Sequence, residues 1–199
     1  MLFGSQRQEV DELNSDLTKT PGWKSADGSL RQRVIRGAEA YIRSADPDNQ
    51  IWFGTDILHR PALAGYRAFQ LLHKENPSAL ATIEQVHWSR WAAMVLCYPM
   101  DGDDPYTQQE LVAAAYARAP QEILVTCPAV LQRAVARSEP SWIHSELAKL
   151  ALCQTDEALR ALMLGLVDGP SLTREHTALY WPRFSGGGFS TLATSQSGS

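Results

Sequence analysis

Cysteine is scarce in this chain of 199 residues, and its three copies, Cys97, Cys127 and Cys153, are far apart. None belongs to a CxxC motif, and none pairs with a histidine at the spacing of zinc ligands. All three lie in apolar segments, where a thiol behaves as a small hydrophobic side chain. The sequence therefore predicts buried, reduced thiols in a cytoplasmic protein, and no metal site built on cysteine.

The sequence also lacks the usual features of two further classes of protein, those that bind nucleic acid and those that enter or cross a membrane. Lysine and arginine number 18 against 22 acidic residues, so the net charge is −4 and no basic excess attracts nucleic acid. No apolar run approaches the ~18 residues that cross a bilayer, and the first residues do not resemble a secretory signal. We therefore expect a soluble cytoplasmic protein that binds neither nucleic acid nor a membrane.

Motifs that carry catalysis are also missing. The glycine run 186–188 is not followed by Lys-Ser/Thr, and no serine stands in a GxSxG context. Asp101, Asp103 and Asp104 lack the loop spacing and the distal bidentate glutamate of an EF-hand, so they indicate a solvated turn. No catalytic, metal-binding or cofactor-binding residue is predicted, and the chain is interpreted as a non-enzyme.

Helical periodicity is what the sequence does contain, along almost its whole length. Asn76 is expected to cap one helix, a capping box at 107–110 to open another, and Thr155 to cap the last. Residues 19–29 are expected to form a connector. The predicted helices cover residues 6–18, 29–44, 61–75, 77–96, 107–119, 121–137, 142–153 and 156–167, with breaks at Pro128 and Pro140.

These helices are predicted to pack as antiparallel hairpins, because short turns marked by proline separate them. Hairpins that start near residues 61, 108 and 142 are spaced about as far apart as known helical repeats. The sequence thus favours an all-α fold, either an irregular α-solenoid (a helical-hairpin array) or, alternatively, a single compact helical bundle. We expect one domain over residues 1–184 and a Gly/Ser-rich tail over residues 185–199.

The stretch HWSRWAAMVLCYP (87–99) contains the strongest candidate for a functional histidine. On a helix, Leu80, Ile83, His87, Trp91 and Met94 form one stripe in which His87 is the only polar member. Because no acidic residue shares this stripe, His87 is interpreted as a packed histidine that donates one hydrogen bond. The alternative is a ligand pocket, whose lining residues would be Tyr66, His87, Trp88 and Trp91.

Two other helices show further patterns. Leu30, Val34, Ala38 and Tyr41 recur at helical spacing and define the helix over about residues 29–44. In the helix that starts near Pro61, Gly65 stands among alanines. Glycine weakens a helix interior, so we expect Gly65 to be needed for the close approach of another helix.

The last apolar segment before the tail is rich in aromatic residues. Trp, Tyr and Arg are favoured anchors of protein interfaces. We therefore predict that this segment contacts a protein partner or a second copy of the chain. The candidate residues are Tyr180, Trp181, Arg183 and Phe184.

About a quarter of the chain, residues 50–100, shows a more specific pattern. A Trp and a Gly-Thr precede a helix that opens Arg-Pro-Ala and continues Ala-Gly-Tyr-Arg-Ala, and Trp-x-x-Trp follows before a Tyr-Pro stop. The residues are Trp52, Gly54, Thr55, Arg60, Pro61, Ala62, Ala64, Gly65, Tyr66, Arg67, Ala68, Trp88, Trp91, Tyr98 and Pro99. This pattern resembles the helical region downstream of the ATPase module in bacterial NACHT-type (STAND) NTPases, some of which act in antiviral defence.

The resemblance implies an α-solenoid that senses or scaffolds within a large ATPase. This chain lacks the NTPase module, so the resemblance implies a fragment, a split gene product or a stand-alone relative, and ATP hydrolysis does not carry over. The leading prediction is a non-enzymatic helical module that binds a protein. The alternatives are a small all-α enzyme or ligand-binding bundle, and an adaptor or inhibitor encoded by a phage or plasmid.

Overall fold

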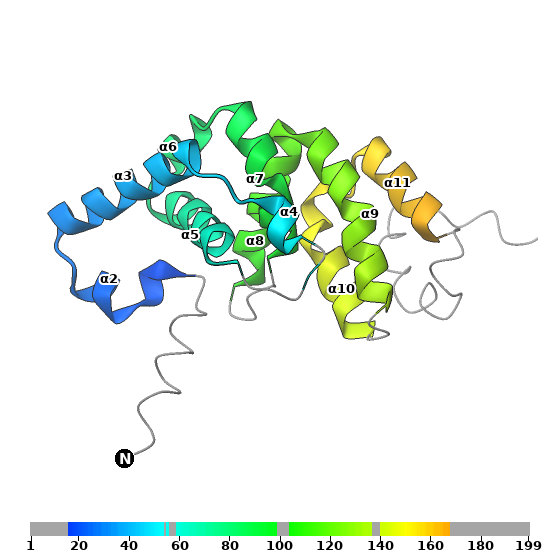
Figure 1. Cartoon of the computed structure of the whole chain (residues 1–199), viewed down its shortest axis with the longest axis horizontal. Coiled ribbons are helices and arrows are strands. Elements are labelled where there is room, and N and C mark those ends of the chain that lie inside the picture. The colour runs from blue at the N-terminus through cyan, green and yellow to red at the C-terminus, as the bar shows by residue number, and fades with distance from the viewer. Residues whose placement is uncertain (1–15, 54, 56–58, 99–103, 137–139, 168–199) are drawn as a thin grey trace, which may run out of the picture.

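The computed structural model describes residues 16–53, 55, 59–98, 104–136 and 140–167, with 134–136, 140–144 and 166–167 described by backbone alone. Every regular element in these ranges is a helix, so the all-α class is confirmed. The longer helices are α3 (Gly28–Ser44), α5 (Arg60–Glu75), α7 (Gln85–Cys97), α8 (Pro105–Arg118), α9 (Pro120–Ala136), α10 (Pro140–Lys149) and α11 (Glu157–Val167) (Figure 1). The short ones are η1 (Leu17–Lys19), α2 (Pro21–Ser25), α4 (Asn49–Trp52), α6 (Pro77–Ala81) and η2 (Ala151–Cys153).

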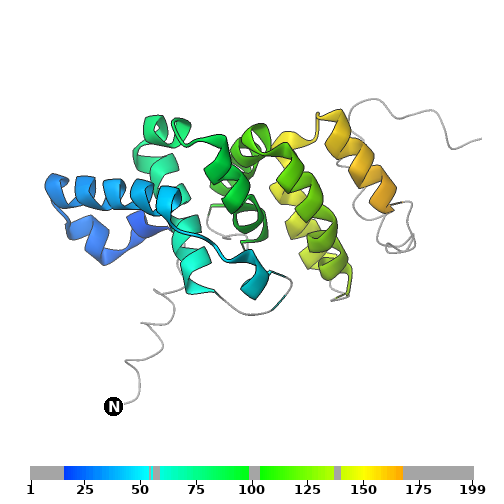
Figure 2. The same cartoon turned by 45° about the horizontal axis from the view of Figure 1, so that its top comes forward.

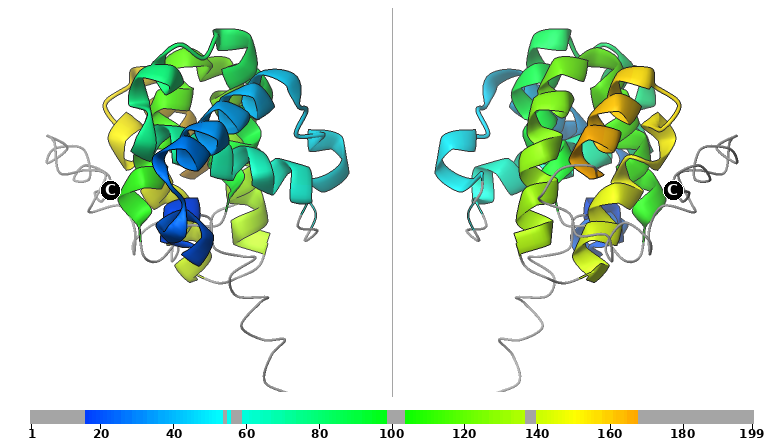
Figure 3. Two further views of the ribbon diagram at one scale, coloured as in Figure 1. Left: turned by 90° about the vertical axis from the view of Figure 1, so that its left-hand side faces the viewer. Right: turned by 90° about the vertical axis from the view of Figure 1, so that its right-hand side faces the viewer.

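The long helices pack in two rows. Helices α3, α7, α9 and α11 contact one another in that order, and we call them the first row. Helices α5, α8 and α10 also contact one another in order and form the second row. Figure 2 shows the first row progressing along the long axis of the molecule. In the end views of Figure 3, α2 and α3 lie at one end of the stack and α11 at the other.

Helix starts follow capping residues, although some are not the ones expected from the sequence. Asn76 accepts a hydrogen bond from the Ala79 N–H and caps α6, as predicted. Helix α8 starts earlier than predicted, because Asp104 rather than Thr107 is its N-cap. Thr107 lies inside the first turn, where it donates its N–H and its hydroxyl to Asp104. An ionised aspartate at the N-cap accepts these hydrogen bonds, and its negative charge interacts favourably with the positive end of the helix dipole.

Two more caps correct the sequence-based boundaries. At α11 the N–H groups of Ala158 and Leu159 donate to Asp156, so Asp156 and not Thr155 caps this helix. The expected connector at 19–29 contains α2, which Thr20 caps. Of the expected helix at 6–18, residues 6–15 lie outside the described residues, and the remainder includes η1.

The predicted helix breaks are wrong in two places. The expected continuous helix at 77–96 is interrupted after Ala81, and α7 begins only at Gln85. The hydroxyl of Thr82 donates to the Ala79 carbonyl and closes the short helix. In contrast, Pro128 lies inside α9 without ending it. Proline removes one helical hydrogen bond, and packing of the flanking Ile123 and Leu131 in the core offsets that loss.

Helix α3 forms where the sequence predicts it, and its buried face includes only part of the apolar stripe that defines the helix in the sequence. Its buried residues are Ile35, Ala38 and Ile42, which lie against the rest of the core. Leu30 and Val34 are 43% and 37% exposed. The helix carries two adjoining apolar stripes, and spacing alone does not distinguish which of them a neighbouring helix will cover.

The contact between α5 and α7 is close because Gly65 has no side chain. A Cβ at this position would lie 2.6 Å from Cε3 of Trp91 and closer still to Cζ3 and Cη2. The Trp91 ring fills this space, and its Nε1 donates to the Ile42 carbonyl at 3.0 Å. The Trp91 indole, which belongs to α7, therefore contacts both α3 and α5. The close approach predicted at Gly65 is confirmed.

We expect Gly65→Ala to destabilise the protein, although alanine favours helices. The added methyl forces α5 and α7 apart, and such overpacking typically costs about 1–3 kcal/mol. The matched control is Gly37→Ala in α3, where a Cβ meets nothing within 4 Å. That control should stabilise the protein by about 0.5–1 kcal/mol. Urea unfolding measures both, and a Gly65→Ala variant as stable as wild type would contradict the close contact.

Candidate functional site

Three of the four predicted pocket residues are fully buried. Tyr66, Trp88 and Trp91 are each at most 1% exposed. Tyr66 stacks on Tyr98 with the ring centroids 3.8 Å apart, and Phe69 packs against Trp88 at 4.7 Å and Trp91 at 6.2 Å. These rings pack against one another and fill the contact between α5 and α7.

His87 lies apart from these ring contacts. It is half-buried in the first turn of α7, where the interruption after Ala81 brings it near the end of the helix. Its buried Nδ1 has no hydrogen-bond partner among the described residues. The hydrogen bond expected from sequence is therefore not made by this nitrogen.

The predicted partner-binding residues, Tyr180, Trp181, Arg183 and Phe184, lie outside the described residues. In the described ranges, no helix combines the length and apolarity needed to span a membrane. Within the same ranges, no three His, Cys, Asp or Glu side chains gather closely enough to hold a metal ion.

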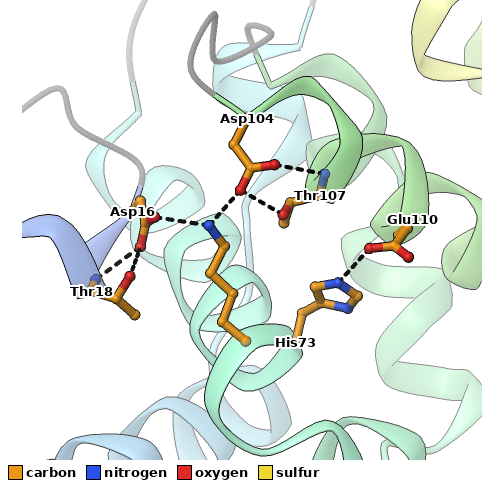
Figure 4. Close-up of polar contacts among 7 residues, drawn as sticks. Asp16, Thr18, His73, Asp104, Thr107 and Glu110 are labelled. Atoms are coloured by element: carbon orange, nitrogen blue, oxygen red, sulfur yellow. Dashed lines mark hydrogen bonds and ion pairs between the residues drawn. The ribbon is translucent and has the colours of Figure 1, made fainter.

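The structure brings together a polar cluster that the sequence did not reveal (Figure 4). Lys74, at the end of α5, donates to Asp16 at 2.8 Å and also to Asp104. Each carboxylate accepts further hydrogen bonds from a threonine, Thr18 for Asp16 and Thr107 for Asp104. The Lys74 ammonium thus joins the segment before α2 to the second row.

Charge complementarity dominates this cluster. Burial alone would raise the pKa of both carboxyls, but the hydrogen bonds from Lys74 and the threonines outweigh it. The pKa of Asp104 is lowered to about 2, and that of Asp16 is lowered as well. Burial likewise opposes the charge on Lys74, yet its two carboxylate partners raise its pKa. All three groups are held ionised, which suits a structural joint between segments.

A second polar contact joins the same two helices. Nε2 of His73 lies 2.9 Å from Oε2 of Glu110, and both side chains are about one-third exposed or less. Sequence spacing offered no sign of this pair, because 37 residues separate its members. Together with the Lys74 cluster it fixes α5 against α8.

Lys149 of α10 forms a buried ion pair within its own helix and a hydrogen bond to α7. Lys149 is fully buried and donates to both oxygens of Glu146 at 2.8 Å and to the Leu96 carbonyl at 3.2 Å. Removing one partner of such a pair typically costs 3–5 kcal/mol, because a buried charge is left uncompensated. The glutamate thus balances the buried charge, and the hydrogen bond to the Leu96 carbonyl joins α10 to α7.

The three cysteine thiols are buried or partly buried. Cys127 and Cys153 are buried, as predicted, while Cys97 is partly buried, and none forms a disulfide. Burial raises the pKa of Cys97 and of Cys127 to about 12. Since the thiolate is the nucleophilic form, these groups are protonated and inert at neutral pH.

Exposed apolar side chains occur on every helix of the first row. They are Leu30 and Val34 on α3, Val86 on α7, Val125 on α9 and Leu164 on α11. Val125 is 76% exposed and Val86 56%. Exposed large apolar side chains also occur outside the first row, at Ile51, Tyr106 and Leu152. Single exposed apolar residues are ordinary, and the first row differs in that each of its helices carries at least one.

Comparisons with known proteins identify no relative. No protein-family model matches the sequence, and no curated protein and no solved structure matches it at a significant level. The resemblance to NACHT-type proteins therefore stays a prediction from residues 50–100.

We expect Asp104→Asn to destabilise the protein more at pH 7 than at pH 3. The folded-state pKa of Asp104 is about 2, below its ordinary 3.8. Its stabilising effect is therefore complete above the unfolded pKa and is lost as the pH falls through the folded pKa. Urea unfolding at both pH values measures the difference. Lys74→Met should reduce this pH dependence but leave part of it, because the Thr107 hydrogen bonds also lower the pKa of Asp104. An equal cost of Asp104→Asn at pH 7 and pH 3 would contradict the assignment.

We expect His87→Leu to be tolerated, at a cost of no more than about 1–2 kcal/mol. Its buried Nδ1 makes no hydrogen bond that leucine would remove. Thermal and urea unfolding provide the measurement. An activity that disappears in His87→Leu while the unfolding curve stays unchanged would show that this histidine is functional.

Proposed function

We propose that this chain is a non-enzymatic helical scaffold that binds a protein partner, and that its two rows form an irregular α-solenoid. The observation that carries the proposal is the first row itself. Each of its four helices carries at least one exposed large apolar side chain, although the chain has a well-filled core elsewhere. Stacked helical hairpins commonly use such an extended surface for binding.

The polar clusters support the same interpretation. Lys74 and Lys149 direct their hydrogen bonds to groups within the protein, and the bonds to Asp16, Asp104 and the Leu96 carbonyl join segments that are distant in sequence. A rigid arrangement of this kind keeps a binding surface in one shape and lowers the entropy cost of association.

The resemblance of residues 50–100 to the helical regions of NACHT-type NTPases favours a sensor or scaffold role. The residues that carry it are packing residues: Trp52, Gly65 and Tyr66 are buried, and so are Trp88 and Trp91. They support an architecture, and the binding role follows from the exposed side chains of the first row.

The test replaces exposed apolar residues of the first row and compares them with a matched change on other elements. The variant Val86→Glu/Val125→Glu alters α7 and α9, and the control Tyr106→Glu/Leu152→Glu alters α8 and η2. All four residues are exposed, so each variant should keep the wild-type stability to within about 0.5 kcal/mol per site. Both variants add two negative charges.

Tagged, purified proteins are incubated with native cell extract, cross-linked and analysed by quantitative mass spectrometry, and light scattering reports self-association. The first-row variant should lose a specific partner by about tenfold or more, while the control retains it. Equal capture by all three proteins would refute the proposed surface. So would the absence of any partner together with a monomeric wild-type chain.

A further inference from the structure

The exposed side of α9 carries no charged residue, although charged residues make up 20% of the chain. Gln121, Val125, Ala129 and Gln132 follow one another at helical spacing and are all exposed, and we call them the α9 face. Val125 is 76% exposed, the largest fraction among the exposed large apolar side chains of the described residues. The core of a protein interface is likewise depleted of charged residues.

Helix α9 occupies an inner position of the first row. It packs between α7 and α11 and also contacts α8 and α10 (Figure 1). The α9 face stays exposed beside all of these contacts, so it is a lateral surface of the stack. Another helix can therefore lie along it without displacing a neighbour.

The two charged residues of α9 lie along one edge of the α9 face. Glu122 and Arg133 are about three helical turns apart, so they are on the same side of the helix and about 16 Å apart along its axis. The point midway between them falls between Cys127 and Pro128, close to the middle of the α9 face. An acidic and a basic group are thus placed symmetrically about the centre of an uncharged surface.

We propose that the α9 face binds the α9 face of a second copy of this chain, with the two helices antiparallel about a two-fold axis. Each interaction then occurs twice. Antiparallel helices place the same edge of each helix side by side, so Glu122 of each copy meets Arg133 of the other. Val125 lies opposite the small Ala129 of the other copy, which lets the helices approach closely. This inference rests on the proposed binding role of the first row and specifies its partner.

The charge pattern selects a second copy in this one orientation. In a parallel pair, each Glu122 would face the other Glu122 and each Arg133 the other Arg133, and like charges opposite one another are repelled. An unrelated helix would need an acidic and a basic residue at the reversed spacing, whereas a second copy carries them by symmetry. Arg133 also donates to the Thr55 carbonyl, and a guanidinium with five N–H donors can hold several acceptors at once.

Sedimentation velocity of the full chain measures the association. The wild type should form a dimer with a dissociation constant on the order of 10 μM, because one helix face buries less area than a standard interface. Val125→Glu should weaken the dimer at least about tenfold, since each copy then places a charge near the centre of the contact. The matched control is Leu152→Glu, at an exposed apolar position of η2, and it should dimerise as the wild type does.

Charge reversal tests the antiparallel pairing. Glu122→Arg should weaken the dimer at least about tenfold, because both ion pairs become contacts between like charges. This variant also reduces the net negative charge of the chain, so long-range repulsion alone predicts the opposite, a stronger dimer. Glu122→Arg/Arg133→Glu has the net charge of the wild type and should restore the dimer, because opposite charges meet again.

Thermal unfolding establishes that each variant is folded. If Glu122→Arg/Arg133→Glu does not fold, because Arg133 also holds the Thr55 carbonyl, Glu122→Arg decides by itself. The proposal is overturned by a wild type that stays monomeric up to about 0.5 mM, fifty times the expected dissociation constant. It is also overturned by a dimer that survives Val125→Glu, by Glu122→Arg associating as strongly as the wild type, and by a folded double variant that stays monomeric.

The proposed scaffold function is tested separately. If the chain is monomeric while Val86→Glu/Val125→Glu still loses a partner from cell extract, only the inference about α9 falls. If Glu122→Arg loses the dimer but Val86→Glu/Val125→Glu keeps its partner from the extract, the wider first-row surface falls and the α9 pairing stands.

Discussion

The placement of the Trp91 ring over Gly65 is the contact on which the arrangement of the first three long helices depends. The ring occupies the space that any other residue at position 65 would need, and its Nε1 donates to the Ile42 carbonyl. Helices α3, α5 and α7 are therefore held by one side chain. In this arrangement Ile35, Ala38 and Ile42 of α3 are buried, whereas Leu30 and Val34 are 43% and 37% exposed.

Two ionic clusters extend this arrangement beyond the aromatic core. Lys74 holds the segment before α2 and the start of α8, and Lys149 holds α10 against the end of α7. Both ammonium groups lose solvation, and the carboxylates around them restore the lost interactions. Apolar packing around Trp91 thus positions α3, α5 and α7, whereas the lysine clusters position the segment before α2 and helix α10. At least one large apolar side chain stays exposed on each helix of the first row.

The same division explains which parts of the fold were predictable. Helices were recognised because apolar periodicity and capping chemistry are local, as at Asn76 and at Gly65, whose cost in a helix indicated a close contact. The errors arose where two local solutions compete. Asp104 and Thr107 can both cap α8, and the start at Asp104 also supplies a partner for Lys74. The buried face of α3 shows a similar ambiguity, since either of its apolar stripes satisfies the helical period and only packing selects Ile35, Ala38 and Ile42.

The sequence by itself determined an all-helical chain, most helix positions and the buried character of Tyr66, Trp88 and Trp91. These features follow from apolar periodicity and helix capping, which involve residues close together in the sequence. Only the tertiary structure decided which polar residues meet. Lys74 lies 58 residues from Asp16 and 30 from Asp104, and His73 lies 37 from Glu110. No periodicity encodes such separations, because they depend on how whole helices are positioned. The exposure of Leu30 and Val34 was decided in the same way, by the neighbour that took the other face of α3.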